Sequence, residues 1–209
     1  MYELLRHPDH LAALVAALDA HVDVPTGKLI RQLPLLSNII SESLRLNPSA
    51  PFETVQSHAP GPIGLPDGTV VLPGDIVYWC IWAVNRSPRS FGPDAEEFRP
   101  ERWEAVDKKP SAYEFATFYS GPRTCPGQQM ARLEIAFVLA ELFRRYELSP
   151  VWDSPRRLDE GIGGEMQGGL PVKVTRRVAR VAGVAQDGPQ RGVESSPPKG
   201  LFDVFDLLV

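Results

Sequence analysis

Apolar side chains recur every three or four residues in three stretches of this 209-residue chain, which is the spacing of one face of an α-helix. The first stretch begins at Pro8, the second covers residues 34–47, and the third runs from Gln128 to about Tyr146. A proline opens each of the first two stretches, where it suits the first helical turn, and Pro48 disfavours helix in the residue before it. The pattern therefore predicts three amphipathic helices.

Between the second and third predicted helices, the chain changes to short runs rich in β-branched and aromatic residues. Runs at 69–72 and 75–79 are preceded and separated by Gly/Pro turn signals, and a similar run at 170–174 follows a Gly-rich segment. We expect two or three short antiparallel strands before residue 80, a short helix over 79–87 and a strand near the C-terminus. The predicted fold class is mainly α with small antiparallel β-sheets.

The composition is that of a soluble globular protein, with 43% hydrophobic residues and a formal net charge of −4. This balance argues against general binding of nucleic acid, which needs a basic surface. No stretch reaches the roughly 18 consecutive apolar residues of a transmembrane helix, and no signal-peptide pattern follows Met1, so we expect neither a membrane anchor nor a signal peptide. Because residues 178–200 are rich in Gly, Pro, Gln and Ser, we expect an ordered domain over 1–177 and a disordered tail over 178–209.

The segment from Phe118 to Gly127, F-Y-S-G-P-R-T-C-P-G, places a cysteine in a Gly/Pro-shaped loop just before the third predicted helix. The free N–H groups and the positive dipole end of a helix N-terminus favour an anion, so a thiolate at Cys125 would be stabilised there. Arg123 is a permanent cation that suits a carboxylate, and Phe118 could cover the sulfur. The segment indicates a thiolate ligand to a metal, with Cys125 as the ligand.

Two other roles of Cys125 stay open on these residues alone. A lone cysteine is commonly a small buried hydrophobe. A cysteine at a helix start is also a candidate nucleophile, but it would need a histidine base, and the four histidines, at positions 7, 10, 21 and 58, are distant in sequence. The metal ligand is favoured by the aromatic, basic and glycine residues that accompany the cysteine: Phe118, Gly121, Arg123, Cys125 and Gly127.

A second motif, E-x-x-R, lies in the second predicted helix. Glu42 and Arg45 are three residues apart, so their side chains share one face of that helix. Alone, such a pair is usually a solvated surface ion pair that contributes about 0–1 kcal/mol. A third motif, P-E-R-W, follows at 100–103.

Along the chain, the E-x-x-R motif, the P-E-R-W motif and the cysteine loop follow one another in the order typical of the cytochrome P-450 superfamily, and all three resemble its motifs. The resemblance implies that Cys125 is the proximal ligand to the iron of haem b, that Arg123 binds a haem propionate and that Phe118 lies beside the thiolate. Gly121 completes the loop pattern, and Gly127 would let the haem approach closely. A thiolate ligand donates electron density to haem iron and favours cleavage of the O–O bond.

The resemblance also assigns a structural role to Glu42, Arg45 and Arg102. In the family these positions form a mostly buried carboxylate–guanidinium network beneath the cysteine loop, which holds the loop and performs no chemistry. One departure is Asn85, which stands where many relatives carry histidine.

The resemblance covers residues 1–177 and corresponds to the C-terminal half of the cytochrome P-450 fold. This half does not include the family's helix that delivers protons on the distal haem face, so we assign no catalytic residue. The implied partners are an apolar small-molecule substrate and an NADPH-dependent reductase, and relatives are anchored at the endoplasmic reticulum membrane. Within the family, the amino-acid sequence is most similar to that of fungal microsomal hydroxylases of alkanes or fatty acids.

The resemblance leaves two hypotheses about activity. In the first, the chain is the haem-binding half of a monooxygenase that inserts one oxygen atom of O2 into its substrate. In the second, it is a non-catalytic truncated product, or an incomplete gene model, that at most binds haem or a partner. A cysteine-nucleophile enzyme is the third and least favoured hypothesis.

Overall fold

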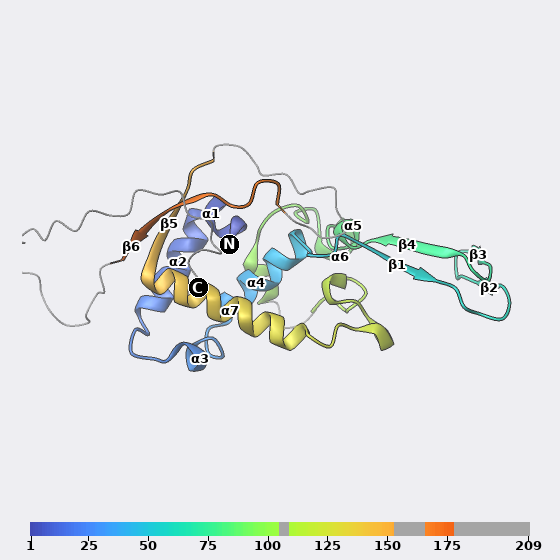
Figure 1. The fold of residues 1–209 in the computed structure, drawn as a ribbon, viewed down its shortest axis with the longest axis horizontal. Coiled ribbons are helices and arrows are strands. Elements are labelled where there is room, and N and C mark those ends of the chain that lie inside the picture. The colour runs from blue at the N-terminus through green and yellow to red at the C-terminus, as the bar shows by residue number, and fades with distance from the viewer. Residues whose placement is uncertain (105–108, 153–165, 178–209) are drawn as a thin grey trace, which may run out of the picture. The chain divides into compact units, whose positions relative to one another are not determined.

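Figure 1 shows the protein as a computed structural model, in which residues 1–104, 109–152 and 166–177 are described. They form two compact units. The first, here called the terminal unit, comprises residues 1–40, 127–152 and 166–177, and the second, the central unit, comprises residues 41–104 and 109–126. The predicted tail, residues 178–209, lies outside the described residues.

The elements follow one another in this order along the described residues: α1 (Tyr2–Arg6), α2 (Pro8–Asp19), α3 (Thr26–Leu29), α4 (Pro34–Leu46), β1 (Phe52–Gln56), β2 (Ile63–Gly64), β3 (Val70–Val71), β4 (Ile76–Cys80), α5 (Ile81–Val84), α6 (Pro88–Phe91), the 3-10 helices η1 (Pro100–Trp103), η2 (Ala116–Phe118) and η3 (Gly121–Arg123), α7 (Gln128–Arg145), β5 (Tyr146–Pro150) and β6 (Val172–Arg176). The three helices predicted from periodicity are α2, α4 and α7. The start of α2 and both ends of α4 and α7 agree with the prediction within one residue.

In the terminal unit, α7 contacts α2 and α3, and β5 and β6 form an antiparallel hairpin. The core of this unit includes Leu139, Leu142 and Phe143, which are at most 5% exposed. Arg177 extends the hairpin, since its backbone N–H donates to the Arg145 carbonyl at 2.8 Å. Its guanidinium bonds to the Phe143 carbonyl and to a carboxylate oxygen of Asp19, each at 2.6 Å. The C-terminal half of α7 is thus held by apolar contacts and by the hydrogen bond from Arg177.

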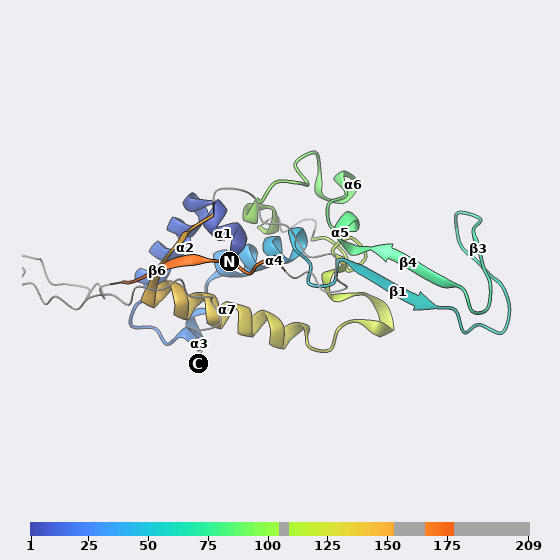
Figure 2. The ribbon, with the colours of Figure 1, turned by 45° about the horizontal axis from the view of Figure 1, so that its top comes forward.

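The N-terminal half of α7 leaves part of its predicted apolar face exposed. Met130, Leu133 and Phe137 are 66%, 48% and 48% exposed, although they belong to the predicted apolar stripe. Figures 1 and 2 both show α2 alongside the C-terminal part of α7. Periodicity identifies the apolar face of a helix, but it does not show which neighbours cover that face.

In the central unit, β1 and β4 form an antiparallel ribbon in which Phe52 lies opposite Cys80 and Gln56 lies opposite Ile76. The small β2–β3 pair lies at the tip of this ribbon (Figure 1). Strand β3 lies within the predicted run 69–72, β4 ends one residue beyond the predicted run 75–79, and the short helix α5 lies within the predicted 79–87. β1 and β2 were not predicted, because their residues are mostly exposed and β2 is only two residues long, so neither strand has a buried alternating pattern.

Helix α4 carries the E-x-x-R motif. Leu36 and Ile39 are fully buried, and so are Glu42 and Arg45, all at 0% exposure. The described residues are mainly helical with small two-stranded antiparallel sheets, which confirms the predicted fold class. In the same residues, no helix is both long and apolar enough to cross a membrane.

Candidate functional site

A single buried carboxylate, that of Glu42, organises the central unit. Its oxygens accept hydrogen bonds from two arginine side chains, one backbone N–H and one indole N–H. The donors are Arg45 at 2.8 and 2.9 Å, Arg102 Nε at 2.7 Å, the Arg99 backbone N at 2.9 Å and Trp103 Nε1 at 2.9 Å. A carboxylate has about four lone-pair sites, so this one is fully used by the protein.

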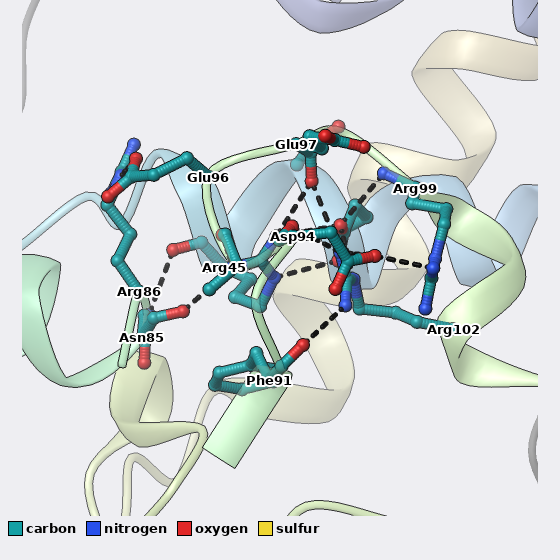
Figure 3. Close-up of polar contacts among 12 residues, drawn as sticks. Arg45, Asn85, Arg86, Phe91, Asp94, Glu96, Glu97, Arg99 and Arg102 are labelled. Carbon is teal, nitrogen blue, oxygen red and sulfur yellow. Dashed lines mark hydrogen bonds and ion pairs between the residues drawn. The ribbon is translucent and has the colours of Figure 1, made fainter. Parts of the chain in front are cut away.

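Arg45 is fully satisfied as well. Besides its two bonds to Glu42, the guanidinium donates to three backbone carbonyls, those of Asn85, Ala95 and Glu97, at 2.9, 2.5 and 3.0 Å. Figure 3 shows Arg45 at the centre of these contacts. Because a guanidinium carries five N–H donors, five bonds leave none of them unpaired at 0% exposure.

Arg102 provides the second positive charge. Its side chain is 7% exposed and donates to the carbonyls of Phe91 and Asp94 at 3.1 and 3.0 Å, in addition to Glu42. The close-up in Figure 3 shows Arg102 between Phe91 and Asp94. The structure therefore brings Glu42, Arg45 and Arg102 together, and it adds Trp103, for which the sequence suggested no role.

The surroundings of Glu42 set its protonation state. Burial alone would raise the pKa of this carboxyl, but hydrogen bonds from Arg45, the charge of Arg45, and the bonds from Arg99 and Arg102 outweigh it. The pKa of Glu42 consequently lies below its ordinary value, and the group is an anion at neutral pH.

The cysteine loop contrasts with this network, because residues 121–126 are all exposed. Cys125 is one of these exposed residues, and its backbone N–H donates to the Phe118 carbonyl at 2.8 Å. Thr124 closes the other end, since its N–H and its hydroxyl bond to the Gly121 carbonyl at 3.1 and 2.8 Å. Backbone bonds thus fix the loop and leave the sulfur accessible.

Two residues of this loop adopt left-handed backbone conformations. Gly121 has φ of 65°, and a Cβ built there would lie 3.8 Å from the Tyr113 hydroxyl, an ordinary contact. Conformation and not space therefore explains glycine at this position. Tyr119 has φ of 64°, which is uncommon for a residue other than glycine, and its ring lies 5.1 Å from that of Trp79.

Phe118, Arg123 and Gly127 are the remaining predicted residues of the loop. Phe118 ends η2 and is half-buried, and Arg123 ends η3 and is exposed. Gly127 is the N-cap residue of α7 and makes no side-chain cap. In the terminal unit, the Arg144 guanidinium donates hydrogen bonds to the carbonyls of His21 and Val24 within the fold.

Asn85 was noted in the sequence only as a departure from its relatives. In the structure it is 0% exposed, and its side-chain amide bonds to Arg45, Ala116 and Thr117. No local sequence signal points to these contacts, because the partners are at least 31 residues away in the chain.

The residues present fit a haem. A soft thiolate suits haem iron, and Cys125 presents its sulfur on an exposed loop with a fixed backbone. Across residues 1–104, 109–152 and 166–177, no group of three or more His, Cys, Asp or Glu is placed to hold a metal ion.

Comparison with known proteins supports this chemistry. The family model for Cytochrome P450 matches residues 1–173. A "Cytochrome P450" of Arthroderma benhamiae is 35% identical over 156 residues, which are 69% of this chain and 31% of the relative. "Benzoate 4-monooxygenase bphA" of Aspergillus niger is 32% identical over 186 residues, 85% of this chain and 35% of the relative. "Cytochrome P450 52-M1" of Starmerella bombicola is 39% identical over 139 residues, 62% and 26% of the two chains.

The match defines a haem-thiolate protein, and the chain belongs to the cytochrome P450 family. Family membership implies a haem cofactor. The matched part spans about a third of the length of the first two of these relatives.

Proposed function

We propose that this chain forms the haem-binding part of a cytochrome P450 monooxygenase, with Cys125 as the axial thiolate ligand of haem b. The observation that carries the proposal is the exposed Cys125 thiol on a loop that is closed by the bond from its own backbone N–H to the Phe118 carbonyl. With haem bound there, the site has haem-thiolate chemistry, in which the thiolate donates electron density to iron and favours O–O cleavage.

Other loop residues bind and orient in this proposal. Arg123, which is exposed, pairs with a haem propionate, since a guanidinium matches a carboxylate in fork geometry. With haem bound, the half-buried Phe118 would cover the side of the thiolate that is exposed in the haem-free chain. The left-handed conformation of Gly121 shapes the turn, and Gly127 admits the porphyrin plane.

Glu42, Arg45 and Arg102 act as the scaffold of the central unit. Their charges are satisfied within the protein, and they connect α4 to residues 85–102 by side-chain bonds to backbone carbonyls. Removal of one partner would leave a buried charge unpaired, which typically costs about 3–5 kcal/mol. We therefore assign these residues to stability and not to proton or electron transfer.

For the whole protein we propose insertion of one oxygen atom of O2 into an apolar organic substrate, while the other atom leaves as water. Electrons would come from an NADPH-dependent reductase. Family membership supports this reaction, and the names of the relatives suggest the assay substrates. Benzoate should be tested beside fatty acids and alkanes, the substrates implied by the resemblance to fungal hydroxylases.

The test is a haem titration of the chain followed by reduction under carbon monoxide. We expect the red-shifted Soret band of a thiolate ligand in the parent chain and its loss in Cys125→Ser. Cys80→Ser is the matched control, because the Cys80 sulfur accepts the Ala83 N–H at the start of α5 and a serine oxygen can replace it there. A thiolate band that survives in Cys125→Ser would overturn the proposal, and so would its absence in the parent.

A further inference from the structure

We propose that Asn85 and Thr117 are positioning residues that tie the C-terminal end of α4 to the cysteine loop. The inference rests on the proposed role of Cys125 as haem ligand. It follows from a continuous set of hydrogen bonds within the central unit, between the last turn of α4 and the backbone of Cys125.

The first link is at the end of α4. The last four carbonyls of a helix have no partner within it, so they need other donors when they are buried. The Arg45 carbonyl accepts the Asn85 Nδ2 at 3.1 Å, and the Leu44 carbonyl accepts the Thr117 hydroxyl at 3.0 Å. Two side chains from distant segments thus cap this helix.

The second link joins these two caps to η2. Asn85 Nδ2 donates to Thr117 Oγ1 at 2.8 Å, while Asn85 Oδ1 accepts the backbone N–H of Ala116 at 3.0 Å. Asn85 therefore uses both the donor and the acceptor ends of its amide, at 0% exposure. An aspartate has the same shape but no N–H donors. It therefore cannot donate to the Arg45 carbonyl or to the Thr117 hydroxyl oxygen, as the Asn85 amide does.

The third link reaches the cysteine. Phe118 directly follows Thr117, and its carbonyl accepts the Cys125 N–H at 2.8 Å. The Tyr119 N–H returns to the Ala116 carbonyl at 2.9 Å and begins the turn in which Tyr119 has a positive φ. The position of Ala116 and Thr117 thus determines where the Phe118 carbonyl lies, and that carbonyl holds the backbone of Cys125.

The same residues also connect to the buried network, because the Asn85 carbonyl accepts Arg45 Nη1 at 2.9 Å (Figure 3). Asn85 therefore contacts Arg45 through its backbone and its side chain, and it contacts η2 through its side chain. The network fixes α4 and the backbone of Asn85. The side-chain amide of Asn85 in turn fixes Ala116 and Thr117, which precede the cysteine loop.

The test uses Thr117→Val, which preserves the branched shape and removes the hydroxyl, with Thr117→Ser as the matched control that retains it. Asn85→Asp is the second variant. In the haem-free chain we expect amide hydrogen exchange at Cys125 and Tyr119 to accelerate about 2- to 10-fold in Thr117→Val, the range that corresponds to one lost hydrogen bond. Exchange in the β1–β4 ribbon should stay unchanged, as should all rates in Thr117→Ser.

In the haem-loaded chain, the reduced carbon monoxide complex supplies a spectroscopic readout. We expect Thr117→Val and Asn85→Asp to lower the fraction with a thiolate-type Soret band, and to raise the pH at which this band replaces the thiol-type band. A role that is merely structural would lower the melting temperature and leave this pH unchanged.

Unchanged exchange at Cys125 in both variants would overturn the inference, as would an equal acceleration throughout the central unit. A parent chain without a thiolate-type band would instead overturn the proposed function. The exchange measurement needs no haem, so the two failures can be told apart.

Discussion

The Glu42 network and the cysteine loop lie in the same unit, but the protein satisfies their polar groups in opposite ways. Glu42 and Arg45 are 0% exposed, and each makes its full set of hydrogen bonds with the protein. The loop around Cys125 is exposed, and the hydrogen bonds that hold it come mainly from the backbone. The polar groups of the network are therefore used within the fold, while the proposed ligand, Cys125, lies in the exposed loop.

The largest expected effect comes from Glu42→Ala. This change strands two guanidinium groups, those of Arg45 and Arg102, in a buried site, so we expect a loss of about 3–5 kcal/mol in the free energy of unfolding, measured by urea denaturation. Glu96→Gln is the control, because the Glu96 side chain is 71% exposed in its pair with Arg86 and should cost at most about 1 kcal/mol. Equal losses in the two variants would remove the distinction between network and surface.

Protonation of Glu42 should have a smaller effect, since it removes the charge and keeps the side chain. Because the folded-state pKa of Glu42 is lowered, its stabilisation is fully present above the unfolded pKa of about 4.3 and is lost as the pH falls through the folded value. The free energy of unfolding should therefore decline below about pH 4. Glu42→Gln should flatten this acid limb, and an unaltered limb in that variant would contradict the assignment.

Trp103→Phe tests a single member of the network. The substitution retains an aromatic ring and removes the indole N–H that bonds to Glu42 at 2.9 Å. Hydrogen bonds to charged groups contribute about 1.5–3 kcal/mol, so thermal and urea unfolding should show a loss in this range. A variant as stable as the parent would show that the other donors to Glu42 suffice.

These contacts also show what the sequence could and could not predict. Helical periodicity located α2, α4 and α7, because each has an apolar face in contact with a core. Spacing placed Glu42 and Arg45 on one face of α4, and only the resemblance to a family connected them with Arg102. The roles of Trp103 and Asn85 were missed, since they depend on partners 31 or more residues away.

The β1–β4 ribbon and the burial of the N-terminal half of α7 were harder to predict from the sequence, for a different reason. β1 has three exposed residues in succession, so burial leaves no alternating pattern to detect. In α7, Leu133 and Phe137 have the spacing of core residues and are nonetheless 48% exposed. A hydrophobic pattern states that a face is apolar, and tertiary structure decides whether it is covered.

The smallest expected effect on stability belongs to Cys125→Ser. The side chain is exposed and is not part of the network, so the free energy of unfolding of the haem-free chain should change by less than about 0.5 kcal/mol. This result, beside the large loss in Glu42→Ala, would complete the separation between scaffold and ligand. A loss of several kcal/mol on urea denaturation would place Cys125 in the core.

Iron K-edge absorption of the haem-loaded chain tests the bond between the Cys125 sulfur and haem iron most directly. We predict a sulfur scatterer in the first coordination shell of iron in the parent chain and in Cys80→Ser, and its disappearance in Cys125→Ser. A first shell of nitrogen and oxygen alone in the parent chain would contradict the account.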